Sequence, residues 1–77
     1  MMSLENLKAG QKGVIAGLHG GHGVVSRLAT LGFTPGVQVE MVRNHGHGPV
    51  IVAVRGSQVA LGRGEAAHVI LVSLEGA

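Results

Sequence analysis

The sequence of 77 residues contains no cysteine, tryptophan or tyrosine, and Phe33 is its single aromatic residue. Without cysteine, neither disulfides nor thiolate-bound metals can stabilise so small a chain. A chain of this length buries only about 60% of the surface that its unfolded state exposes. We therefore expect one small domain over residues 1–77, with its core at about 4–74 and built from Val, Leu, Ile and Ala.

Charge is also scarce, with six Lys and Arg against four acidic residues and a net charge of +2. The cations form no run, and the aromatic residues that would stack on bases are missing, so we expect no nucleic-acid partner. The longest apolar stretches, 49–54 and 68–74, are too short to cross a bilayer, so we expect no direct membrane insertion. Because residues 1–6 lack the features of a signal peptide, we expect a cytoplasmic protein that reaches the membrane only through a partner.

Groups suited to catalysis are few. The sequence has no aspartate and no glycine-rich loop followed by the Lys and Ser or Thr that bind a nucleotide phosphate. The glycine-rich segment 20–23 precedes an expected helix, whose start favours anions, but the segment carries no cation. In the expected layout Ser26, Ser57 and Ser73 have no base beside them to activate a hydroxyl. We therefore expect a protein that is not an enzyme.

Glycine is abundant, at 14 residues, and it separates short apolar segments. Apolar residues alternating with period two predict strands at 11–18, 37–44, 50–54, around 59–61 and at 68–74. Val24, Val25, Leu28 and Leu31 recur at helical spacing, which predicts a helix of two turns that ends at Gly32. A type II turn at 34–37, a tight hairpin at 55–57 and one 3₁₀ turn within 62–67 complete the prediction.

Strands and connections in this order predict a mostly β fold, a small SH3-like five-stranded barrel with one short helix inserted in the first long loop. Closing a small sheet into a barrel removes the unpaired edges that promote aggregation.

The chain resembles the FeoA family of small cytoplasmic proteins in bacterial ferrous iron transport. The resemblance covers roughly residues 4–72, and the residues that carry it are Leu4, Leu7, Gly10, Val14-Ile15, Arg27-Leu28, Leu31-Gly32-Phe33-Thr34-Pro35-Gly36, 50–54, Gly56, 59–61, Glu65-Ala66 and 69–72. Each is a turn, a cap or a core position, so the specificity lies in their order and spacing.

This resemblance implies an SH3-like barrel that assists FeoB, a membrane transporter with a cytoplasmic G-protein domain. The protein would be a non-enzymatic accessory or regulatory protein that binds the cytoplasmic part of FeoB. Similar domains at the C-terminal end of iron- and manganese-dependent repressors leave a metal-sensing module as the alternative. A stand-alone metal carrier is a third hypothesis, and it depends on the histidines alone.

Two sets of residues are candidates for a site. The helix side and one strand end offer a partner-binding surface of Arg27, Leu28, Leu31, Phe33 and Arg43, although a core position is the simpler interpretation of the apolar ones. Four histidines in two loops expected to lie near each other, His19, His22, His45 and His47, offer nitrogen ligands for Zn, Ni or Fe. We expect that no cofactor is required, and the alternative to a metal site is that these histidines are solvated loop residues. We expect His68 to be structural.

Overall fold

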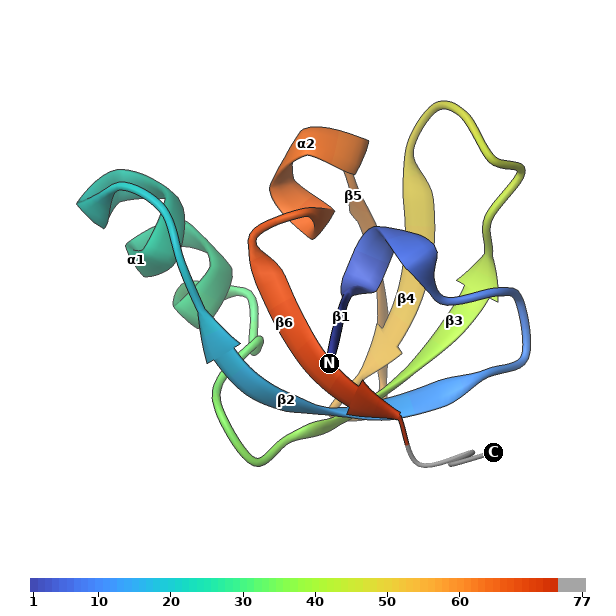
Figure 1. The fold of residues 1–77 in the computed structure, drawn as a ribbon, viewed down its shortest axis with the longest axis horizontal. Coiled ribbons are helices and arrows are strands. Elements are labelled where there is room, and N and C mark those ends of the chain that lie inside the picture. The colour runs from blue at the N-terminus through green and yellow to red at the C-terminus, as the bar shows by residue number, and fades with distance from the viewer. Residues whose placement is uncertain (74–77) are drawn as a thin grey trace.

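The computed structural model describes residues 1–73 (Figure 1). Its strands are β1 (Met2–Ser3), β2 (Lys12–Leu18), β3 (Gln38–Arg43), β4 (Val50–Val54), β5 (Ser57–Leu61) and β6 (Val69–Ser73). They form one antiparallel sheet of six strands in the order β1-β6-β2-β3-β4-β5. The helical elements are η1 (Leu4–Asn6), α1 (His22–Thr30) and α2 (Arg63–Ala66).

The mostly β prediction is confirmed, with four differences in detail. The first is a sixth strand, because Met2 and Ser3 pair with Leu71 and Ile70. Two residues are too few to show a period-two pattern, so the sequence gives no signal for this strand. The curled sheet also stays open within the described residues, where no pairing joins β1 to β5.

The helices account for the other two differences. Helix α1 begins at His22, two residues before its apolar pattern starts, because Gly21 is its N-cap. The predicted 3₁₀ turn is instead a short α-helix, α2, in which the amides of Ala66 and Ala67 donate to carbonyls four residues earlier. The predicted last strand ends at residue 73, and residue 74 lies outside the described residues.

The core lies inside the curled sheet and is closed by η1, α1 and α2. It consists of side chains that are 2% exposed or less: Leu4, Leu7, Ile15, Leu28, Phe33, Val39, Met41, Val50, Val52, Val54, Leu61, Ala66, Val69 and Leu71. The expectation of a core made only from Val, Leu, Ile and Ala is therefore wrong at Phe33 and Met41. Both are fully buried, so the largest core side chain is the single aromatic residue.

The end of α1 sets the position of two core residues. Gly32 has a φ of +104°, its amide donates to the carbonyl of Ala29, and the amide of Phe33 donates to the carbonyl of Leu28 at 3.0 Å. These bonds form a Schellman motif, which a residue with positive φ makes possible and which glycine adopts without strain. The motif brings Leu28 and Phe33 together, and both side chains enter the core.

Candidate partner-binding surface

Helix α1 lies at one end of the molecule, at the left of Figure 1, outside the curled sheet. Among its nine residues only Leu28 is fully buried, while Val24 and Val25 are half-buried. Its remaining side chains are exposed, and Leu31, directly after the helix, is half-buried. A helix this short is stable only when it is packed, so Leu28 must supply much of the free energy that holds it.

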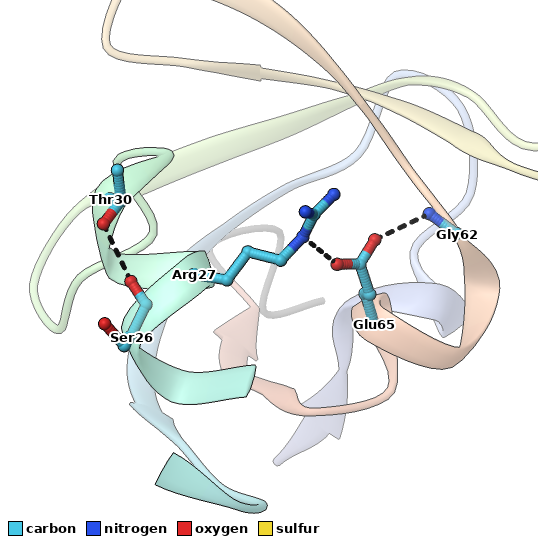
Figure 2. Close-up of polar contacts among 5 residues, drawn as sticks. All are labelled: Ser26, Arg27, Thr30, Gly62 and Glu65. Atoms are coloured by element: carbon cyan, nitrogen blue, oxygen red, sulfur yellow. Dashed lines mark hydrogen bonds and ion pairs between the residues drawn. The ribbon is translucent and has the colours of Figure 1, made fainter. Parts of the chain in front are cut away.

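An ion pair ties α1 to α2 (Figure 2). The Nε of Arg27 donates to Oε2 of Glu65, and the other carboxylate oxygen of Glu65 accepts from the amide of Gly62 at 3.4 Å. The Arg27 side chain is 65% exposed and that of Glu65 is 29% exposed. An exposed pair of this kind adds at most about 1 kcal/mol to stability. Its larger effect is to hold the guanidinium of Arg27 in one place beside the exposed face of α1.

The predicted partner-binding residues do not form one surface. Leu28 and Phe33 are both 0% exposed, so the prediction is wrong for these two, whose side chains fill the core and cannot reach a partner. Arg27 is exposed and Leu31 is half-buried. Arg43 is exposed as well, but it ends β3, and that end lies across the view of Figure 1 from α1.

The prediction that the four histidines converge on a metal is also wrong. His19 and His22 follow β2, whereas His45 and His47 follow β3. Strands β2 and β3 are antiparallel, so the segments that follow them leave opposite ends of the pair, and Figure 1 shows the two segments far apart. Among residues 1–73, no three or more His, Cys, Asp or Glu side chains lie close enough to hold a metal ion.

His19 instead meets His68, a contact that sequence reasoning missed. The two ring centroids are 5.1 Å apart in an edge-to-face arrangement, and the amide of His19 donates to the carbonyl of His68 at 3.0 Å. Gly20 lies against the same ring, where a Cβ would stand 2.7 Å from Nδ1 of His68. The ring of His68, which directly precedes β6, thus packs against His19 and Gly20 just after β2, in keeping with the structural role that we expect for it.

This packing makes Gly20 a sensitive position. We expect Gly20→Ala to lower the free energy of unfolding by about 1–3 kcal/mol, because the φ of +118° disfavours any side chain and a Cβ would clash with His68. Gly23→Ala is the matched control. Gly23 lies within α1 and a Cβ there would meet no other atom within 4 Å, so alanine should raise the free energy of unfolding by about 0.5–1 kcal/mol. Urea denaturation of both variants measures the difference. Equal stabilities would contradict the packing of Gly20 on His68.

A second cluster that sequence reasoning missed is centred on Asn44, next to the exposed histidine loop. Its Nδ2 donates to the carbonyls of Glu5 and Leu7 at 3.0 and 2.7 Å, and its Oδ1 accepts from Nη2 of Arg63 at 2.6 Å. The same oxygen accepts from the amide of Gly46 at 3.0 Å, an Asx-turn that Asn before His-Gly favours. The partners of Asn44 are backbone groups of η1 and its flanking residue, the amide of Gly46 and the guanidinium of Arg63 in α2. The cluster therefore fastens η1 and α2 to the end of β3.

The surface also carries a shallow hollow beside the β4–β5 hairpin, lined by Gln38, Glu40 and Arg55 among others. Its lining holds no histidine, serine or threonine, so it offers no hydroxyl nucleophile and no imidazole base. Within the described residues no helix is long and apolar enough to cross a membrane.

Comparisons with known proteins agree on one family. A family model described as the FeoA domain matches residues 2–73. The chain is 32% identical over 75 residues to an Fe(2+) transport protein A of Methanocaldococcus jannaschii, an alignment that covers 97% of this chain and 90% of the relative.

Solved structures give the same result. The chain matches a crystal structure of an iron uptake regulatory protein, FeoA, with a TM-score of 0.90 and 33% identity, over 95% of this chain and 97% of that one. For the zinc-complexed FeoA of Stenotrophomonas maltophilia, described as an SH3 domain protein, the TM-score is 0.82 at 30% identity, over 94% and 91% of the chains. The predicted SH3-like fold is therefore confirmed.

A manganese-dependent transcriptional repressor shares the fold alone. Its TM-score is 0.88 at 22% identity, and the match covers 95% of this chain but only 36% of the repressor.

Proposed function

The chain belongs to the FeoA family of ferrous iron transport proteins, and from this premise we propose that it binds the cytoplasmic part of a FeoB-type membrane transporter. In this role it regulates iron uptake from the cytoplasmic side without catalysing a reaction. Binding to a transporter explains how a chain whose described helices are too short to span a bilayer takes part in transport.

The observation that supports this proposal is the exposed face of α1. The helix is inserted between two strands that pair directly, β2 and β3, so the sheet does not need it for its pairing. It nevertheless presents exposed residues at the end of the molecule, and one of them, Arg27, is held in place by Glu65. We define the α1 surface as the exposed residues of the helix together with the half-buried Leu31: His22, Gly23, Ser26, Arg27, Ala29, Thr30 and Leu31.

An affinity series tests the α1 surface. We expect Arg27→Ala to weaken binding of the purified cytoplasmic domain of FeoB by about tenfold, the loss typical of a charged contact within an interface. Lys8→Ala removes an exposed cation elsewhere and should change the affinity by less than about twofold. Isothermal titration calorimetry measures both variants, and urea denaturation should show them about as stable as the unmodified chain.

Two further variants test whether binding depends on how Arg27 is held and on which end of the molecule the arginine lies. Glu65→Gln keeps Arg27 but releases it, so binding should weaken less than in Arg27→Ala. Arg43→Ala should leave the affinity unchanged, because the end of β3 lies across the molecule from α1. If Arg43→Ala weakens binding and Arg27→Ala does not, the transporter binds the other end of the molecule and the α1 surface is wrong.

The alternative, a metal-sensing module, has weaker support. Likeness to the repressor at 22% identity extends to the fold only, and the match covers a minor part of that protein. The histidines that would have formed one metal site lie in two separate segments. Transporter binding is therefore the function that the observations favour.

A further inference from the structure

The guanidinium of Arg27 uses only part of its hydrogen-bonding capacity. Its Nε donates to Glu65, whereas neither Nη atom has an acceptor among residues 1–73. The two Nη atoms lie beyond Cζ as seen from Nε, so they point away from Glu65, as Figure 2 shows. Each Nη carries two N–H donors. Because the Arg27 side chain is exposed, these donors are open to an acceptor that another molecule supplies.

Two contacts in sequence fix where this guanidinium lies. Glu65 belongs to α2, and its Oε1 accepts from the amide of Gly62, the N-cap of the same helix, at 3.4 Å. Its Oε2 accepts from the Nε of Arg27, so α2 orients the carboxylate and the carboxylate orients the arginine. A long side chain that is already ordered loses less conformational entropy when a partner binds. Arg27 is therefore preorganised for a contact beside both α1 and α2.

The other arginines of the described chain differ from Arg27 in this respect. Both Nη atoms of Arg63 donate to groups of the chain itself, and Nη2 of Arg55 reaches a hydroxyl at 3.4 Å. Arg43 is exposed, but its side chain has no hydrogen bond within residues 1–73 that would hold it in one position. Within that range only Arg27 combines a guanidinium held by a carboxylate with two Nη atoms that lack a partner.

A carboxylate is the acceptor that best fits this pair of Nη atoms. Its two oxygens match the two Nη atoms in a bidentate pair, and its charge compensates the cation when water leaves an interface. A backbone carbonyl offers one oxygen and no charge. The α1 surface contains no acidic residue that could repel a carboxylate. Glu65 lies on the Nε side, so the guanidinium separates it from a group bound at the Nη atoms.

We propose that an aspartate or glutamate side chain of the transporter's cytoplasmic part binds end-on to Nη1 and Nη2 of Arg27. This inference rests on the proposed function, because it names the chemical group that the α1 surface recognises. Arg27 contacts the partner directly, and Glu65 is the positioning residue that holds the guanidinium in the receiving orientation. The partner group lies beside α1 and α2, and the specificity comes from the fork of the guanidinium as well as from its charge.

The first test compares Arg27→Lys with Arg43→Lys. Calorimetry uses the full chain and the purified cytoplasmic domain of FeoB, in a buffer without nucleotide, phosphate or sulfate that could occupy the Nη atoms. Lysine keeps the charge but has no fork that binds Glu65 and a second carboxylate together, so Arg27→Lys should weaken binding by about fivefold. Arg43→Lys makes the same exchange at the exposed end of β3 and should change the affinity by less than about twofold.

Nuclear magnetic resonance of the arginine side chains tests the geometry on the unmodified chain. In the free protein we expect the Nη groups of Arg27 to rotate rapidly about their bonds to Cζ, which averages their proton signals. A bidentate carboxylate slows this rotation, so separate Nη proton signals of Arg27 should appear in the complex. A purely structural role of Arg27 would leave these signals averaged, because its contact with Glu65 involves Nε alone.

Ionic strength gives a third readout. Raising it from about 0.05 to about 0.3 M should weaken binding of the unmodified chain more than that of Arg27→Ala, because salt screens the ion pair. Equal affinities of Arg27→Lys and the unmodified chain, averaged Nη signals in the complex, or the same salt dependence without Arg27 would each overturn this inference while the proposed function stands. Absence of any binding by the unmodified chain would overturn both.

Discussion

Phe33→Ala is expected to remove a large part of the protein's free energy of unfolding. Phe33 is 0% exposed and is the largest fully buried side chain, so truncation removes about 3–5 kcal/mol of stability. At roughly 0.05–0.15 kcal/mol per residue, a domain of 77 residues has a total stability of about 4–12 kcal/mol, so this loss is a large part of it. Because tryptophan and tyrosine are absent, far-ultraviolet circular dichroism during urea denaturation is the measurement.

Two controls show whether the loss comes from burial. Phe33→Leu keeps most of the volume and should cost about 1.5 kcal/mol or less. Leu31→Ala truncates a half-buried side chain just after α1 and should cost less than Phe33→Ala. A Phe33→Ala variant that stays as stable as the unmodified chain but loses transporter binding would show that Phe33 contacts the partner, contrary to its burial.

Asn44→Ala is expected to lower the free energy of unfolding by about 2–4 kcal/mol. The substitution removes an acceptor for Arg63 and leaves the carbonyls of Glu5 and Leu7 without the Nδ2 donor. Polar groups left unsatisfied in a partly buried site cost about 1–3 kcal/mol each, and more when charged. Urea denaturation measures the loss, and amide hydrogen exchange should become faster in η1 and α2.

A second asparagine provides the matched control. Asn6 is exposed, and its side chain donates one hydrogen bond, to Oγ of Ser3 at 3.2 Å. We expect Asn6→Ala to change stability by less than about 0.5 kcal/mol. If Asn44→Ala is equally mild, water replaces its hydrogen bonds and the cluster does not fasten η1 and α2 to the end of β3.

Much of the fold could be predicted because its signals are local. The alternation of Val50, Val52 and Val54 marks a strand whose residues alternate in burial, and all three valines enter the core. Gly36 has a φ of +89° and the amide of Val37 donates to the carbonyl of Thr34, as the Thr-Pro-Gly-Val sequence predicts for a type II turn. Each of these features depends on a few consecutive residues.

The site was harder to predict because it depends on contacts between distant segments. Helical spacing alone does not show whether Leu28 is buried or faces a partner, and the core position is the one observed. The convergence of four histidines required two loops at the same end of the strand pair, whereas the antiparallel pairing of β2 and β3 places them at opposite ends. The Asn44 cluster joins residues 37, 39 and 19 positions apart, which no local pattern signals.

The most direct test of the proposed function is a titration of the isotope-labelled chain with the purified cytoplasmic domain of FeoB. Amide chemical shifts should change in 19–32, which includes α1, and around Glu65, which holds Arg27. The loop 44–49, across the view from α1, should not shift. Absence of shifts at high concentration of the domain would contradict binding to the cytoplasmic part of the transporter.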